Sequence, residues 1–261
     1  MRLSRSIFFY VILVISTLSC GSSAVIGSFV WRAWPNLMAT IWGNINLWAA
    51  GVKVNITGLE NIRDRGPYIF VSNHQGWFDI FAALGKLPIR FSWLAKEELF
   101  KIPIFGRAML RAGYIPIDRR DHRKAMESMN KAAEAIRRGT SVFIFPEGTR
   151  SADGVIRGFK KGAFILAAKS QQPIVPISIS GSYRILLKNS RMINPGEIRF
   201  SVGKPIETAG TDTDSRNLLL EKTREAIRGN LTPEEAGNEP KVGPEANNIT
   251  SDDKAVSNGD A

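Results

Sequence analysis

The chain has 261 residues, 44% of them hydrophobic, which allows one substantial core and at most two domains. Its formal net charge of +11 suits a nucleic-acid, membrane or anionic-substrate partner. No run of Lys and Arg is interleaved with aromatic residues and no nucleic-acid-binding signature is present, which argues against nucleic acid. The single cysteine, Cys20, excludes an intrachain disulfide framework and a cysteine-based zinc site.

Two apolar segments open the chain. Residues 6–31 carry no charge after Arg2 and Arg5 and would form a helix about 38 Å long, which exceeds the hydrocarbon core of about 30 Å. Residues 33–52 are also uncharged, with apolar side chains at helical spacing and several asparagines, so they predict an amphipathic, interfacial helix. Four of the six tryptophans lie in or beside this second segment, as is typical of a membrane boundary. We expect residues 1–50 to anchor the protein in a membrane.

A cleaved secretory signal is the alternative for the N-terminus. Arg2 and Arg5 precede an apolar stretch, and the small residues Ser16, Thr17 and Ser19 follow it. A lipidated Cys20 would be a variant of this alternative. Against both, the apolar character continues well past Cys20.

From residue 52 onward, short apolar runs alternate with helical stretches, which predicts an α/β domain. The expected strands are 52–57, 68–72, 91–95, 114–117, 141–145, 174–180 and 198–202. The expected helices are 78–87, 123–138, 161–169 and 215–229. Pro116 interrupts the ladder of the strand at 114–117, so this strand should lie at an edge or contain a bulge.

The last thirty residues, 232–261, contain almost no large apolar side chains and are rich in acids, Asn, Gly and Pro. Such a segment does not offset the entropy of ordering itself, so we expect a disordered acidic tail. Its net charge of −5 leaves +16 on residues 1–231. The folded part is therefore strongly basic.

Two histidines limit any imidazole chemistry to His74 or His122. His122 lies in a charged helix approach, where a histidine is usually solvated and idle. His74 directly follows the apolar strand at 68–72, and in open α/β sheets ligands bind at the carboxyl ends of strands.

Asp79 lies five residues after His74. On one regular helix the two side chains would point about 140° apart. They can meet if His74 lies in a loop and Asp79 in the first helical turn, with Gly76 permitting the bend. Asp79 would then fix the imidazole tautomer and leave the other nitrogen free as a base, while the reacting hydroxyl could come from a substrate.

A second polar cluster, residues 145–151, follows the apolar strand at 141–145. Gly148 allows a ligand to approach the backbone closely, and the Arg150 guanidinium is a planar fork suited to phosphate. The alternative is a surface loop with an ion pair between Glu147 and Arg150.

These clusters together resemble the 1-acyl-sn-glycerol-3-phosphate acyltransferase family. Its four ordered blocks are similar to Asn73-His74 with Asp79, then to residues 113–119, 145–151 and 175–181. The match extends over roughly residues 50–205. The resemblance implies a glycerolipid-acyltransferase-like α/β fold, with a mixed, mainly parallel sheet flanked by helices and an N-terminal membrane helix pair. The domains would then be anchoring helices at 1–50, an acyltransferase domain at 51–231 and the tail at 232–261.

The resemblance also implies the chemistry. In an O-acyltransferase of this kind, His74 would take a proton from the acceptor hydroxyl and Asp79 would orient the imidazole, with no metal, no cofactor and no acyl-enzyme intermediate. The acyl donor would be acyl-CoA or acyl carrier protein, and the product would be phosphatidic acid. The acceptor phosphate would be held by a set of residues carried over from the family: Lys96, Arg119, Glu147, Gly148, Thr149 and Arg150. An ordinary surface lysine is the alternative for Lys96.

The four blocks do not distinguish lysophosphatidate from other acyl acceptors. They include glycerol 3-phosphate, a lysophospholipid with a headgroup and a lyso-amino-acid lipid, and an inactive lipid-binding relative is a further alternative. The positive-inside tendency places Arg2, Arg5 and the basic domain on the cytoplasmic face, which requires an even number of crossings or a re-entrant dip. Membrane lipids and the acyl donor are the expected partners.

Overall fold

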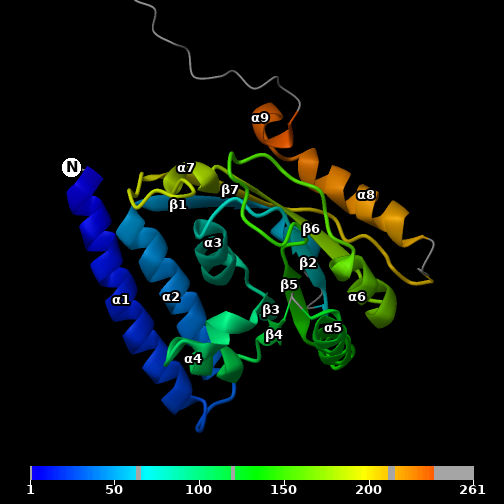
Figure 1. Cartoon of the computed structure of the whole chain (residues 1–261), viewed down its shortest axis with the longest axis horizontal. Helices are drawn as coiled ribbons and strands as arrows, with labels where there is room; N and C mark the ends of the chain where they lie inside the picture. The colour runs from blue at the N-terminus through cyan, green and yellow to red at the C-terminus, as the bar shows by residue number, and fades with distance from the viewer. Residues whose placement is uncertain (1, 63–65, 119–120, 211–214, 238–261) are drawn as a thin grey trace, which may run out of the picture.

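A seven-stranded sheet forms the centre of the structure, a computed structural model that describes residues 2–62, 66–118, 121–210 and 215–237 (Figure 1). The strand order is β1-β7-β6-β2-β5-β3-β4, and every neighbouring pair is parallel except β6 with β7. The strands are β1 (Val52–Thr57), β2 (Ile69–Ser72), β3 (Phe91–Lys96), β4 (Ile115–Ile117), β5 (Ser141–Ile144), β6 (Ile174–Ser180) and β7 (Gly196–Val202). The predicted mixed, mainly parallel α/β sheet is confirmed.

Helices connect and cover the strands. They are α1 (Arg2–Gly27), α2 (Trp34–Ala50), η1 (Leu59–Ile62), α3 (Phe78–Lys86), η2 (Glu97–Lys101), α4 (Phe105–Arg111), α5 (His122–Arg137), α6 (Gly162–Ser170), α7 (Ser182–Ile185), α8 (Arg216–Arg228) and α9 (Pro233–Ala236). The four helices predicted for the α/β domain, now α3, α5, α6 and α8, are confirmed to within two residues at each end. The sequence pattern did not predict α4, the short α7 and α9, or the two 3-10 turns η1 and η2.

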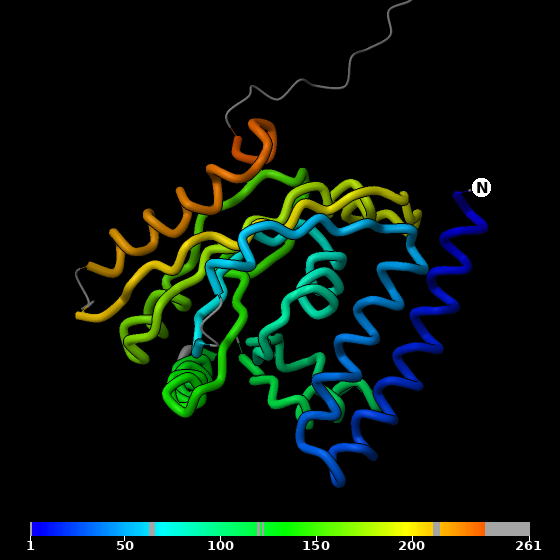
Figure 2. Tube along the Cα trace, turned by 180° about the vertical axis from the view of Figure 1, so that it is seen from behind, coloured from blue at the N-terminus to red at the C-terminus, as the bar shows by residue number. Residues whose placement is uncertain are grey.

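Helices cover both faces of the sheet, because neighbouring residues of a strand point to opposite sides. In β2, Phe70 packs with α1, α2, α3 and α4 on one face. Ile69 and Val71 pack with α5, α6 and α8 on the other face. The two layers are visible from both sides of the molecule (Figures 1 and 2). Strands buried on both faces explain the continuous apolar runs of β2, β5 and β6.

The N-terminal helices α1 and α2 pack side by side along one flank of the molecule (Figure 1). Trp42 Nε1 donates to Thr17 Oγ1 over 3.0 Å, and Trp34 Nε1 donates to Ser23 Oγ over 3.1 Å, so polar contacts join the pair. Within the described part of the chain, α1 is the one helix long and apolar enough to cross a membrane. Two N-terminal helices are therefore present, but among the described residues only α1 has the length and apolar character of a membrane span, so the membrane helix pair is not confirmed and stays a prediction.

The structure tests two further predictions, the place of the strand that contains Pro116 and the start of the acidic tail. The strand that contains Pro116, β4, lies at the edge of the sheet and pairs with β3, as predicted. The tail, in contrast, was predicted to begin at residue 232, but Thr232 caps the helix α9 through a capping box, and Glu235 is buried. The carboxylate of Glu235 accepts a bond of 2.9 Å from the backbone N–H of Gly181, which is why order continues past residue 231. Residues 238–261 lie outside the described residues.

Candidate active site

The carboxyl ends of the parallel strands β2, β3, β5 and β6 lie along one edge of the sheet, which brings together segments far apart in the sequence. His74 follows β2, Lys96 ends β3, the 145–151 turn follows β5, and Gly181 follows β6. Three of the four blocks singled out in the sequence, together with Lys96, therefore lie at the edge where open α/β sheets bind ligands. The second block contains the edge strand β4, whose Ile117 pairs with Lys96.

His74 and Asp79 are in direct contact at this edge. His74 Nδ1 lies 2.7 Å from Asp79 Oδ2, and the Asp79 side chain is fully buried. The same Oδ2 accepts backbone N–H bonds from Gln75 at 2.7 Å and from Gly76 at 2.8 Å. Because a carboxylate only accepts, His74 Nδ1 carries the proton in this contact, and in the neutral imidazole Nε2 is then the unprotonated nitrogen. The predicted arrangement, a loop histidine with an aspartate in the first helical turn, is confirmed.

Other side chains hold the loop in place. The Asn73 amide bonds both backbone groups of Ile179 in β6 at 2.8 Å, so the histidine loop is tied to the fourth block. Ser182 Oγ donates to Asp79 Oδ1. The imidazole of His74 stacks on Phe145, with centroids 3.9 Å apart and planes 12° apart. The His74 ring thus has a fixed rotation and a fixed tautomer.

Glu147 lies behind the histidine rather than in front of it. Its Oε1 accepts the backbone N–H of His74 at 2.9 Å and its Oε2 that of Arg157 at 3.2 Å. Burial raises the pKa of the Glu147 carboxyl to about 7, against the opposing effect of these two hydrogen bonds. Glu147 is 4% exposed and does not line the cavity in front of His74, so its place is that of a brace for the loop and not of a phosphate ligand.

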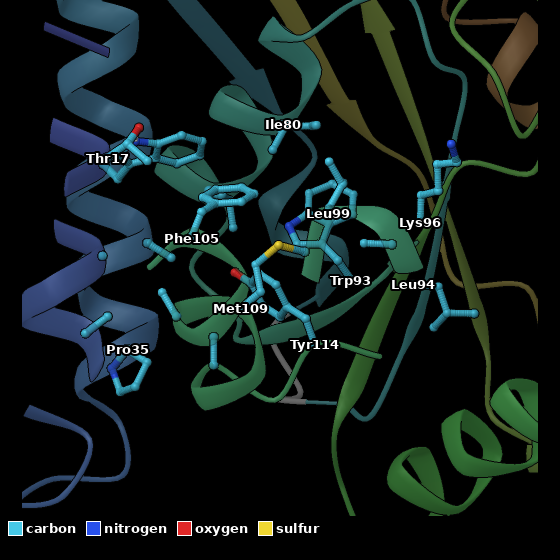
Figure 3. A pocket seen from close by; sticks show the side chains of 18 of the residues that line it. Thr17, Pro35, Ile80, Trp93, Leu94, Lys96, Leu99, Phe105, Met109 and Tyr114 are labelled. Atoms are coloured by element: carbon cyan, nitrogen blue, oxygen red, sulfur yellow. Dashed lines mark hydrogen bonds between the residues drawn. The ribbon is translucent and has the colours of Figure 1, made fainter. Parts of the chain in front are cut away.

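A cavity of about 420 Å³ opens in front of His74. One end is polar and contains His74, Lys96, Gly148, Thr149 and Arg150. The other end is apolar and runs between the sheet and the N-terminal helices (Figure 3). Its walls come from α1, α2, α3, β3 and α4 and include Cys20, Ala24, Met38, Trp42, Ile80, Leu84, Trp93, Phe105, Met109 and Tyr114. A long apolar group with a polar head fits this shape, with the head beside His74.

The cations of the polar end differ in their surroundings. The Arg150 guanidinium lies over the ring of Trp77, 5.7 Å from its centroid. Lys96 Nζ lies 3.0 Å from Glu98 Oε1, and both side chains are about half exposed. Arg119, the remaining cation expected here, lies outside the described residues. The structure thus brings Lys96, Thr149 and Arg150 together with His74.

Several residues that shape the site, among them Trp77, Phe145 and Ser182, were not predicted from the sequence pattern. Phe145 and Trp77 stand inside the segments that were singled out, but nothing in the pattern indicated stacking. Ser182 directly follows the fourth block, so its place at the strand end was the available signal. Among the described residues, no three His, Cys, Asp or Glu side chains lie close enough to hold a metal ion.

Comparison with known proteins finds similarity to acyltransferases. The family model described as Acyltransferase matches residues 53–180. A chloroplastic 1-acyl-sn-glycerol-3-phosphate acyltransferase of Brassica napus is 37% identical over 195 residues, which is 73% of this chain and 56% of that relative. A 1-acyl-sn-glycerol-3-phosphate acyltransferase of Limnanthes douglasii is 32% identical over 197 residues, 75% of this chain and 69% of that relative.

The fold has a counterpart among solved structures. The crystal structure of the 1-acyl-sn-glycerophosphate (LPA) acyltransferase PlsC from Thermotoga maritima superimposes with a TM-score of 0.77 at 27% identity, covering 87% of this chain and 94% of that one. Among the curated relatives, the chain spans little more than half the length of the chloroplastic proteins of Brassica napus and Arabidopsis thaliana, at 56% and 54%.

Proposed function

This chain belongs to the 1-acyl-sn-glycerol-3-phosphate acyltransferase family, and from that premise we propose that it transfers a fatty acyl group from a thioester donor to the sn-2 hydroxyl of 1-acyl-glycerol 3-phosphate. The product is phosphatidic acid. The observation that supports this most directly is the contact of 2.7 Å between His74 and a fully buried Asp79, at the polar end of an apolar cavity. The donor is acyl-CoA or acyl carrier protein.

His74 acts as the general base in this proposal. Its Nε2 removes the proton from the acceptor hydroxyl as the oxygen attacks the thioester carbonyl carbon. The negative charge of Asp79 stabilises the imidazolium that forms, because it lies against Nδ1. Collapse of the tetrahedral intermediate breaks the carbon–sulfur bond, and the imidazolium returns the proton to the departing thiolate. No acyl-enzyme forms, since the acceptor oxygen is itself the nucleophile.

The cavity accommodates an acyl chain. Its volume of about 420 Å³ lies within the usual range of ligand pockets, and its walls away from His74 are apolar. A chain in this space has its carbonyl or glycerol end at the polar mouth, beside His74 and Arg150. Burial of the chain then positions the reacting groups, which raises the rate by making the reaction effectively intramolecular.

A thiol-release assay tests the function. Purified chain in neutral detergent is mixed with lysophosphatidate and acyl-CoA, and free thiol and phosphatidate are measured together. We expect one thiol released for each phosphatidate formed, and thiol release that depends on the acceptor. Binding of lysophosphatidate without thiol release would identify a lipid-binding relative instead, and faster transfer to glycerol 3-phosphate or to a lysophospholipid with a headgroup would identify a different acceptor.

Arg150 holds the acceptor phosphate in this proposal, helped by Lys96 and Arg119. The phosphate monoester carries between one and two negative charges near neutral pH, and a guanidinium binds two of its oxygens at once. Arg150→Lys is therefore expected to lower the kcat/KM for lysophosphatidate by roughly tenfold to a hundredfold, since hydrogen bonds to charged groups contribute about 1.5–3 kcal/mol. Steady-state kinetics with each substrate varied in turn measure the effect, and the KM for the donor should change little.

Arg157→Lys is the matched control for this prediction. Arg157 Nη2 lies 2.7 Å from both carboxylate oxygens of Asp153, and its side chain does not line the cavity. This variant should keep acceptor kinetics close to wild type. A loss in Arg150→Lys that appears in the KM for the thioester donor, with acceptor kinetics unchanged, would assign Arg150 to the donor site.

The N-terminal helices attach the protein to a membrane in this proposal, with the catalytic domain on the cytoplasmic face. Large apolar side chains of α1 stay exposed in the folded chain, among them Leu3, Ile7, Phe8, Val11, Val14, Ile15 and Leu18. Yet α1 is also part of the core, since Phe9 is fully buried with its ring 5.5 Å from that of Phe78. Cleavage after Ser19 would remove Phe9 and uncover the α3 face next to Asp79.

Intact mass spectrometry tests whether the helices are retained. We expect the protein extracted from membranes to keep residues 1–50, and a salt or carbonate wash to leave it in the membrane fraction. A mature N-terminus at Cys20 or later would support the secretory alternative and place the domain outside the cytoplasm.

A further inference from the structure

Gly148 lies against the ammonium of a lysine that the sequence analysis did not single out. A Cβ at Gly148 would lie 3.0 Å from Lys160 Nζ and 3.2 Å from Lys160 Cε. Gly148 also has a φ of +75°, which favours glycine. The Lys160 ammonium therefore occupies space that any other residue at position 148 would fill, on the same turn that presents Arg150 to the cavity.

Backbone hydrogen bonds place Lys160 at this turn. Lys160 N donates to Pro146 O over 2.9 Å, and Arg157 N donates to Glu147 Oε2 over 3.2 Å. The segment from Arg157 to Lys160 is thus fastened along the turn, two residues before α6 begins. These contacts place the backbone of Lys160 beside the turn, from which its exposed side chain reaches Gly148.

Lys160, unlike Arg157 and Lys96, has no carboxylate partner among the described residues. Arg157 is paired with Asp153, and Lys96 with Glu98. The ion pairs found across residues 2–62, 66–118, 121–210 and 215–237 do not include Lys160. Among the described residues, no carboxylate therefore compensates the positive charge of Lys160. The two residues that follow Gly148, Thr149 and Arg150, line the cavity.

We propose that Lys160, which does not itself line the cavity but lies against the lining residue Gly148, binds the phosphate of the acceptor together with Arg150. A phosphate monoester has three free oxygens, of which a guanidinium takes two. An ammonium is a compact point charge with three donors and suits the third oxygen, which accepts more than one hydrogen bond and so leaves room for Lys96 as well. This assignment rests on the proposed function, because it takes the ligand of Arg150 to be the acceptor and not the donor.

The experiment compares Lys160→Met with Lys161→Met in the full chain. Lys161 is the next residue and an exposed lysine, so its variant removes the same charge from the same region. Both variants and wild type are titrated with glycerol 3-phosphate, the headgroup without an acyl chain, by calorimetry in neutral detergent. We expect Lys160→Met to raise the Kd for glycerol 3-phosphate about tenfold and Lys161→Met to leave it near wild type.

Kinetics then separate acceptor from donor. Lys160→Met should lower the kcat/KM for lysophosphatidate about tenfold while the KM for acyl-CoA stays unchanged, and Lys160→Arg should recover most of the loss. An increase in the KM for acyl-CoA alone would mean that Lys160 binds a phosphate of the carrier, and would overturn the proposal. Equal losses in Lys160→Met and Lys161→Met would overturn it too, since they would reflect the general surface charge.

These measurements distinguish failure of the proposed acyl transfer from failure of the Lys160 phosphate site. If wild type does not transfer acyl groups but still binds glycerol 3-phosphate through Lys160, the proposed function fails and the phosphate site stands. If wild type shows no measurable binding of glycerol 3-phosphate, or if Lys160→Met binds it as wild type does, Lys160 has no such role even in an active transferase.

Discussion

Replacing His74 by alanine is expected to lower kcat by about 10²–10⁴, the usual contribution of a positioned general base. The imidazole is held at Nδ1 by Asp79 and against the ring of Phe145, so water would not take its place in the same orientation. Both substrates should still bind, because the cavity and the cations remain. Single-turnover rates of phosphatidate formation from preloaded substrates measure this loss directly.

The second histidine of the chain supplies the control. His122 begins α5, which packs on the other face of the sheet, and His122→Ala should keep wild-type turnover. Because Phe145 loses its stacking partner in His74→Ala, the melting temperature of this variant is measured to verify that it is folded. If the folded variant keeps more than about a tenth of wild-type turnover, His74 is not the base.

Asp79→Asn is expected to have a comparable effect, a loss of about 10²–10⁴ in kcat, with the fold retained. In one orientation of the amide, its oxygen can accept the bonds that Oδ2 accepts now, from His74 Nδ1, Gln75 N and Gly76 N. The amide nitrogen would then face Ser182 Oγ, which can accept instead of donate. Geometry is thereby kept while the negative charge that stabilises the imidazolium is removed.

Ser182→Ala is the informative comparison for Asp79→Asn. It removes the hydrogen bond to Oδ1 but keeps the carboxylate charge, so its effect on kcat should not exceed about tenfold. Rates and melting temperatures of the two variants, measured side by side, distinguish loss of charge from loss of support. Near-wild-type kcat in Asp79→Asn would show that the charge is not needed and that Asp79 only shapes the loop.

Local sequence pattern determined the element types. The strands β1 and β6 have the predicted bounds, and the alternation of apolar runs with helical periods specified an α/β class. It also placed His74 and the 145–151 cluster directly after strands, hence at the carboxyl edge of a parallel sheet. These features depend on the spacing of residues near one another in the chain.

Contacts over long sequence separations decided the rest. The strand order, with β1 beside β7, follows from packing that no local period encodes. Glu147 is turned inward because its carboxylate bonds the His74 backbone from 73 residues away, and a turn sequence alone does not specify on which side a side chain lies. The bond from Glu235 to Gly181, 54 residues apart, likewise orders residues that the composition assigned to a tail.

By itself, the sequence therefore determined the α/β class, the two N-terminal helices and the residues His74, Asp79 and Arg150 as a candidate site, because periodicity, strand ends and residue chemistry are local properties. Only the tertiary structure decided that α1 and α2 form a wall of the same cavity as His74, and that Lys160 lies against Gly148. The physical reason is that burial of apolar surface and satisfaction of backbone hydrogen bonds are properties of the whole chain, and they fix which distant segments meet.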